Sequence, residues 1–409
     1  MNSISLDQKA AYSPGKRLHL TPHKPPPPYG SCLYPMPEGV NVDSLEMTEE
    51  EENLSEREIC FDPRNAPLNI DESNQGNKDF GMEVEILQMI GGVPDDVGSL
   101  GTHKLLCRVI VAPSATPYTN EQRVPIEGQQ LFLKIFDPLF WFDVEVDISV
   151  DGLRPTSLAD MAISDEFAAY HYLFAKGMTG MPHLAPDFLG GWTTEVESVL
   201  SSFRGMKRVV TVLATEYIDG VCLGALYETS GPVDKIIKLH DDGKKSSTLR
   251  TGFKHRMRIM AKIMDGTISQ EFIGVHHGEF HPRNFIITMR NLGQPVKEPR
   301  VAMVGWHSAI VDHLRQEPVE MYRHFTKKIH PYMRFRWNRR LLPFEGWIPS
   351  EWKGPEDNIK DSPMLSQWMV KTFGSVATVD NPTYEGWGNM FQLATVAAPS
   401  EGNVTQEAS

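Results

Sequence analysis

A single lysine interrupts an otherwise apolar stretch of the chain, Lys134 in QQLFLKIFD (129–137). Apolar side chains fall on both sides of this stretch, a pattern that predicts a β-strand with little exposure to water. A buried lysine is costly unless a carboxylate pairs with it. The next predicted helix, 164–176, carries Glu166, and we expect Glu166 to pair with Lys134. The alternative is that the lysine reaches solvent at the strand end and the glutamate lies on an exposed helix face.

Apolar periodicity predicts a sheet followed by helices. The predicted elements are strands at 82–90, 103–112 and 129–137, the helix at 164–176, a strand that begins at 208, a helix at 253–273, and a hairpin of 285–289 with 301–304. From this order we expect an α+β fold, in which a small antiparallel sheet with one helix joins a larger, mainly helical lobe.

The composition is ordinary for a folded protein, with 40% hydrophobic and 23% charged residues among 409. The net charge of -13 argues against a general nucleic-acid or anionic-membrane binder. No apolar run reaches the roughly 18 residues of a membrane span, and the N-terminus lacks the pattern of a secretory signal. The cysteines are scattered, at Cys32, Cys60, Cys107 and Cys222, which fits a reducing compartment. We therefore expect an intracellular protein, cytoplasmic or nuclear, whose partners are neither nucleic acid nor membrane.

Both ends of the chain are expected to be tails. Residues 1–79 contain the Pro-rich stretch TPHKPPPPYGSCLYPMPEG and the acidic run EMTEEEENLSEREI. Such a composition buries too little apolar surface to offset the entropy of ordering, so we expect disorder there. The alternative is a segment that docks onto a partner protein. Residues 377–409 are mostly polar and small, and we expect a flexible C-terminal tail.

The loop HGEFHPRN (277–284) concentrates residue types that phosphoryl transfer needs. Such a reaction depends on a cation that holds the phosphates and on oxygen ligands for magnesium. Glu279 and Asn284 lie five positions apart, so a tight loop would direct a carboxylate and an amide into one cleft. Pro282 would stiffen this loop, and we expect His277 to brace it by hydrogen bonds rather than to react.

These stretches together resemble the protein-kinase-like superfamily, in particular its fungal kinase-like and aminoglycoside-phosphotransferase-like branch. HHGEFHPRNFII is similar to the loop form HGDLHPRN of that branch, and RVAMVGWHSA follows where a strand ending in IDF is typical. LFLKIFDPLF, DEFAAYHYL, TEYIDG and RWNRRLLPFEGWIPSEW add to the resemblance. It implies a two-lobed protein-kinase-like fold, with an N-lobe at 80–215, a hinge at 216–220 and a C-lobe at 221–376.

The resemblance also implies roles for individual residues. Lys134 would contact nucleotide phosphates, and Glu166 would hold it in place. Glu279 stands at the position of the catalytic-base aspartate, and Asn284 stands at that of a magnesium ligand. The adenine would meet the backbone of the hinge residues Glu216, Tyr217 and Ile218. ATP and Mg²⁺ are therefore the cofactors that the resemblance implies.

The sequence departs from this family pattern where the metal should bind. Gly305 occupies the position of the metal-binding aspartate, and Trp306 and His307 replace the next two residues. A glycine offers no side-chain ligand, and imidazole suits softer metals than magnesium. Glu279 adds a methylene to the expected aspartate, and a displacement of about an ångström costs about 100-fold in rate. These changes together predict a pseudokinase with weak or no phosphotransfer, which acts as a scaffold or regulator for an unknown protein partner.

Three alternatives stay open at this point. The first is an active, atypical ATP-dependent phosphotransferase whose substrate is a protein or a small molecule. The second is a zinc site in the histidine-rich loop, where candidate ligands are His276, His277, Glu279 and His281. The third is an accessory role in a fungal biosynthetic pathway, for which no residue argues.

Overall fold

The computed structural model describes most of the chain. It covers residues 7, 10–69, 81–91, 101–114, 124–141, 152–234, 236–241, 246–317, 325–336, 338–349, 352, 362–376 and 381–386. The chain divides into two compact units, which we describe separately. The first unit comprises Met1–Ala225, Ile236–Leu249 and Gly274–Val319, and the second comprises Leu226–Lys235, Arg250–Ile273 and Glu320–Ser409.

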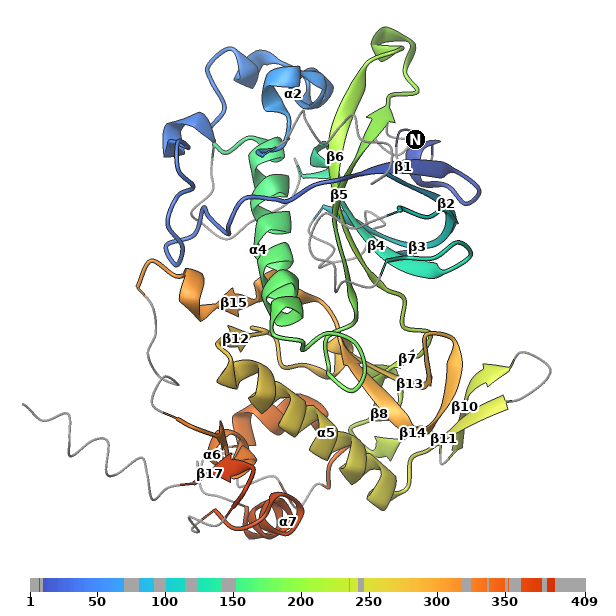
Figure 1. Ribbon diagram of the computed structural model, residues 1–409, viewed down its shortest axis with the longest axis vertical. Coiled ribbons are helices and arrows are strands. Elements are labelled where there is room, and N and C mark those ends of the chain that lie inside the picture. The colour runs from blue at the N-terminus through green and yellow to red at the C-terminus, as the bar shows by residue number, and fades with distance from the viewer. Residues whose placement is uncertain are drawn as a thin grey trace, which may run out of the picture. The chain divides into compact units, whose positions relative to one another are not determined.

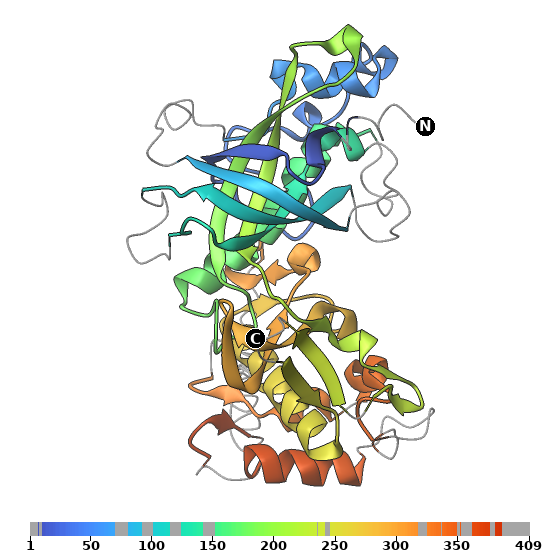
Figure 2. The same cartoon turned by 90° about the vertical axis from the view of Figure 1, so that its right-hand side faces the viewer.

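A closed barrel of six antiparallel strands forms the centre of the first unit, in the spatial order β1-β2-β3-β4-β6-β5 (Figures 1 and 2). Its strands are β1 (Arg17–Pro22), β2 (Met82–Gly91), β3 (Thr102–Val111), β4 (Gln130–Phe136), β5 (Phe188–Glu197) and β6 (Lys207–Glu216). Strand β1 closes the barrel, because Leu18 lies opposite Val84 of β2 and Thr21 lies opposite Thr193 of β5.

Alternation along the strands fills the barrel with apolar side chains and leaves its outer face for other contacts. The enclosed side chains include Leu18, Val84, Leu105, Leu133, Trp192 and Val212. Phe132, Lys134 and Phe136 alternate with the inward residues of β4. Helix α4 (Pro155–Ala175) packs against β4, β5 and β6 and runs beside the barrel in Figure 1. Lys134 is therefore buried between the barrel wall and α4.

Short strand pairs complete the first unit. Strand β13 (Phe285–Asn291) pairs with β14 (Gln294–Met303) and with β7 (Val221–Cys222). Strand β12 (Val275–His276) pairs with β15 (Ile310–Val311), and β10 (Ile236–Asp241) pairs with β11 (Ser246–Arg250). The hairpin expected at 285–289 and 301–304 is present in a longer form, and it places the loop 277–284 between β12 and β13.

The second unit contains α5 (Phe253–Phe272), α6 (Pro331–Phe335) and α7 (Pro363–Phe373), together with the strand pairs β8 (Tyr227–Glu228) with β9 (Gly231–Pro232) and β16 (Lys328–Ile329) with β17 (Tyr384–Glu385). Helix α5 coincides with the helix predicted at 253–273. Its Glu271 binds Arg334 at 2.7 Å and Arg340 at 2.8 Å, which connects the helix to the C-terminal segment. Among the described residues, no helix has both the length and the apolar character needed to cross a lipid bilayer.

The two-lobed protein-kinase-like fold expected from the sequence is wrong. A closed barrel replaces the small open sheet, and the chain beyond Glu216 adds strands β7 to β17 instead of forming a mainly helical lobe. The strand that closes the barrel comes from 17–22, a segment whose surroundings predict a tail. Leu18 and Leu20 alternate there with polar residues and are buried, but a pattern of six residues beside a Pro-rich run does not stand out.

Buried polar contacts join the segment 10–69 to the rest of the first unit. Tyr12 donates a hydrogen bond to Asp137 at 2.7 Å, and Tyr29 donates one to Asp160 of α4 at 2.8 Å. Helix α2 (Glu56–Phe61) begins at a capping box formed by Ser55 and Glu58. The composition predicts disorder through residue 79, yet residues 10–69 hold a barrel strand and a helix. Of the expected C-terminal tail, only 381–386 lie among the described residues, and they include β17.

Candidate functional site

The structure contains the predicted ion pair between Lys134 and Glu166. The Nζ atom of Lys134 lies 2.5 Å from Oε2 of Glu166, and the two side chains are only 8% and 4% exposed. Strand β4 supplies the lysine, and α4 supplies the glutamate. Lys104 of β3 lies opposite Lys134 in the register of the two strands, so the side chains of both lysines project from the same face of the sheet. Sequence reasoning missed Lys104, because only the pairing of β3 with β4 reveals this neighbour.

The loop between β12 and β13 is braced from inside by His277. Its Nε2 donates to the carbonyl oxygen of Val304 at 2.9 Å, and its Nδ1 accepts from the backbone N–H of Glu279 at 3.3 Å. Burial lowers the pKa of His277 to about 4, so the ring is neutral at pH 7. These are the contacts that a bracing residue makes.

Two further features hold the loop in its tight path. A Cβ on Gly278, which has a φ of +83°, would lie 2.2 Å from the carbonyl oxygen of Ser308, so only glycine fits this approach. Pro282 begins the short 3-10 helix Pro282–Asn284, and the His281 side chain caps that helix by accepting from Arg283 N–H at 3.2 Å. Pro282, which the sequence predicts to stiffen the loop, fixes the backbone at the first residue of this helix.

Glu279 and Asn284 do meet, but they bind one another. The Nδ2 atom of Asn284 donates to both the backbone oxygen and Oε2 of Glu279, each at 3.1 Å. Arg283 also donates to Oε2 of Glu279 at 3.1 Å. Burial acts to raise the pKa of Glu279, but the bonds from Asn284 and Arg283 and the nearby His307 outweigh it, so the pKa is lowered. The carboxylate is thus held as an anion and is a weak base.

Gly305 lies at the end of β14, beside Asn284. Its φ of 80° and ψ of 54° place it in the left-handed region, and a Cβ there would lie 3.1 Å from Oδ1 of Asn284. Trp306 packs in the core, with its ring 4.6 Å from that of His277, and donates from its indole N–H to Met303 at 2.9 Å. The position expected to bind metal is therefore a turn in the backbone without a carboxylate.

His307 connects the loop to the ion pair. Its Nε2 lies 3.6 Å from Oε1 of Glu279. Burial and the positive charge of Lys134 lower its pKa, while the charges of Glu166 and Glu279 oppose that shift. His307 therefore lies within the influence of both the Lys134–Glu166 pair and Glu279, and Glu279 in turn binds Asn284.

The expected hinge residues are engaged in internal contacts. The carboxylate of Glu216 receives both terminal nitrogens of Arg300, at 2.6 and 2.7 Å, and both side chains are buried. The backbone N–H of Glu216 donates to the carbonyl oxygen of Asp187 at 2.9 Å, so it is not available to an adenine. Tyr217 is half-buried and Ile218 is buried. Sequence reasoning missed Arg300, although a lone charge beside the apolar run VAMV is the same signal that identified Lys134.

The alternative of a zinc site in the loop is not supported by its geometry. His276 binds Asp312 at 2.9 Å, while His277 and His281 each bind the backbone. The candidate ligands therefore use their polar atoms in separate contacts. Within the described parts of the chain, no three His, Cys, Asp or Glu side chains are arranged to hold a metal ion.

Comparison with known proteins adds no family to this picture. The sequence matches no protein-family model, and a search of the curated proteins gave no match. The residues of the site offer a buried cation, an ionised carboxylate, an amide and a neutral imidazole.

Proposed function

We propose that this protein binds a phosphate-bearing ligand such as ATP at Lys134 and transfers phosphate weakly or not at all. In this proposal the protein acts as a regulator or scaffold for a partner. The observation that carries it is the buried pair of Lys134 and Glu166 next to a loop whose carboxylate, Glu279, is already occupied.

Lys134 supports the binding half of the proposal. A buried ammonium group held by one carboxylate keeps a fixed position, which is what recognition of a phosphate oxygen requires. Lys104 starts from the neighbouring position on the same face, and an anion near both lysines reduces the repulsion between them. The lowered pKa of His307, caused by burial and by Lys134, keeps that ring neutral and able to share a hydrogen bond with a ligand.

Gly305 and Glu279 support the weak-transfer half. Phosphoryl transfer depends on a metal that neutralises the developing charge, and Gly305 contributes no ligand for one. The lowered pKa of Glu279 makes it a poor acceptor for the proton of an attacking hydroxyl. The amide N–H groups of Asn284 donate to Glu279, so the two side chains bind one another instead of facing a substrate.

An active phosphotransferase is the second candidate, and one observation favours it. Oδ1 of Asn284 points toward Gly305, and the ionised Glu279 lies 3.1 Å from the same amide. These two oxygen ligands, completed by water, suit magnesium. This candidate requires magnesium-dependent transfer, whereas the first requires only binding.

A thermal-melt titration with ATP, with and without magnesium, tests the proposal on the full chain. A ligand at 100 times its Kd stabilises by about 2.7 kcal/mol, a shift of several degrees. The test variant is Lys134→Met with Glu166→Gln, which removes the cation without leaving an unpaired charge. The control is Lys207→Ala, which removes an exposed lysine paired with Glu195. We expect ATP to stabilise the native protein and the control but not the test variant.

Two results would change this conclusion. Absence of any ATP-induced shift in the native protein at millimolar concentration rules out the binding site. Release of phosphate that requires both magnesium and Asn284 selects the active enzyme.

A further inference from the structure

A pocket in the second unit contains an arginine as the only charge among its described lining residues. The pocket has a volume of about 580 Å³ and lies at the start of α5, beside the turn that joins β8 to β9. The apolar side chains that line it and are exposed are those of Phe253 and Met364, and Ser230 and Thr229 add hydroxyl groups to the lining. Among the described residues that line it, Arg256 carries the only charge.

Arg256 has no counter-charge in the part of the chain that the structure describes. Its Nε atom is buried and has no hydrogen-bond partner there. Burial lowers the pKa of Arg256, and no carboxylate opposes that shift. Arg334 and Arg340 of the same unit differ, because they share the carboxylate of Glu271. An arginine that is partly desolvated without an anion is costly, and a bound anion would offset this cost.

We propose that this pocket binds an organic anion, whose carboxylate or phosphate pairs with Arg256 and whose apolar part lies against Phe253 and Met364. A guanidinium group binds both kinds of anion through two parallel hydrogen bonds, so its chemistry accepts either. The hydroxyl of Ser230 at the rim can donate to a further oxygen of the ligand. Small-molecule sites typically combine apolar side chains with a few polar groups that orient the ligand.

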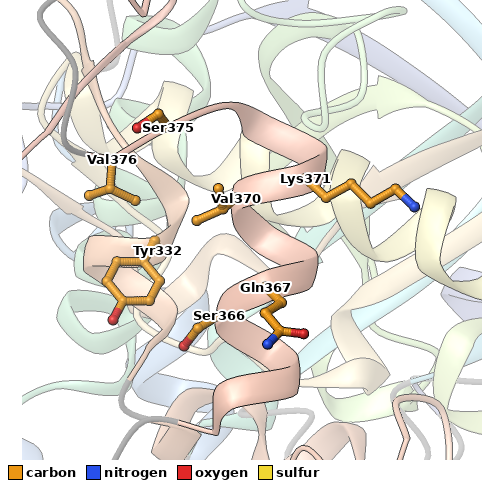
Figure 3. A pocket seen from close by; sticks show the side chains of 7 residues that line it. All are labelled: Tyr332, Ser366, Gln367, Val370, Lys371, Ser375 and Val376. Carbon is orange, nitrogen blue, oxygen red and sulfur yellow. The ribbon is translucent and has the colours of Figure 1, made fainter.

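A neighbouring pocket on α7 shows what this site has in addition. That pocket, of about 610 Å³, is lined by Tyr332, Ser366, Gln367, Val370, Lys371, Ser375 and Val376 (Figure 3). Among the described residues that line it, Lys371 is the one cation, and its side chain extends away from Tyr332 and Val376 in Figure 3. The pocket at Arg256 combines exposed apolar side chains with a lone cation, and this combination specifies a class of ligand.

Isothermal titration of the full chain with four small probes tests the proposal. Benzoate and phenyl phosphate each join an aromatic ring to an anion, inorganic phosphate lacks the ring, and benzyl alcohol lacks the charge. We expect saturable binding of benzoate or phenyl phosphate, at least tenfold tighter than that of inorganic phosphate or benzyl alcohol. Whichever of the two binds more tightly identifies the anion as a carboxylate or a phosphate.

Matched variants locate the binding at this pocket. Arg256→Gln should weaken the better aromatic anion at least tenfold, whereas Lys254→Gln, which removes an exposed charge from the same helix, should leave it unchanged. The variant Lys134→Met with Glu166→Gln should also bind normally, which separates this site from the nucleotide site proposed above. Unchanged melting of the free Arg256→Gln protein shows that it folds. Binding that survives Arg256→Gln, or no binding of either aromatic anion at millimolar concentration, overturns the proposal.

Discussion

Removing one member of the Lys134–Glu166 pair should cost far more stability than removing both. Glu166→Gln leaves the ammonium group of Lys134 between β4 and α4 without a carboxylate, although the two side chains are only 8% and 4% exposed. Leaving one charge of a buried pair unpaired costs about 3–5 kcal/mol. The double change of Lys134→Met with Glu166→Gln removes the charge as well as its partner. We expect it to cost less than about half as much as Glu166→Gln alone.

Urea unfolding followed by tryptophan fluorescence measures this difference. Trp192 lies in the barrel and Trp306 packs beside α4, so both report on the first unit. The free energies of the single and double variants give a coupling energy, which we expect to exceed about 2 kcal/mol. The exposed pair of Lys207 with Glu195 is the control, and it should give less than about 1 kcal/mol. A coupling energy at Lys134 no larger than that of the control would refute the reasoning.

Three further outcomes follow from the charges and the backbone described above. Burial lowers the pKa of His277 to about 4, so as the pH falls the unfolded chain binds a proton at this residue before the folded protein does. The free energy of unfolding should therefore fall by up to about 3 kcal/mol from pH 6.5 to pH 4. Urea unfolding of His277→Asn should lack this part of the loss. Burial raises the pKa of Asp160 to about 7, so the native protein should lose stability as the pH rises from 4 to 7. Asp160→Asn still accepts the hydrogen bond from Tyr29 and should melt at a higher temperature than the native protein at pH 8. Equal melting temperatures at pH 8 would contradict this. Gly305→Asp should destabilise the fold by about 1–2 kcal/mol in the same unfolding assay and should not create magnesium-dependent transfer, because its backbone is left-handed and its Cβ would crowd Asn284; a gain of transfer would contradict this.

Features governed by local cost could be predicted from the sequence. A lysine within an apolar strand needs a carboxylate, and Glu166 provides it. The close spacing in HGEFHPRN brought Glu279 and Asn284 together, because a tight loop of a few residues permits little else. The apolar stripe at 253–273 predicted α5 almost to its ends for the same reason, since helical periodicity is a property of neighbouring residues.

Features governed by distant pairing could not be predicted. The carboxylate of Glu216 is bound by Arg300, 84 positions away, and nothing near Glu216 in the chain indicates that partner. Strand β1 joins β2 and β5 across even longer separations, so the closure of the barrel does not follow from any local pattern. A resemblance that rests on motif residues describes a site, and here it led to the wrong architecture around that site.

The closing strand β1 also determines how the protein can be shortened. A chain that begins near residue 80 lacks Arg17–Pro22, so β2 and β5 each lose a neighbour and present a row of unpaired backbone groups to other molecules. Such edges favour pairing between copies. The loss of the apolar side chains of β1, including Leu20, would also leave a gap in the barrel. Strand β1 thus covers an edge of β2 and an edge of β5, a role unrelated to any ligand.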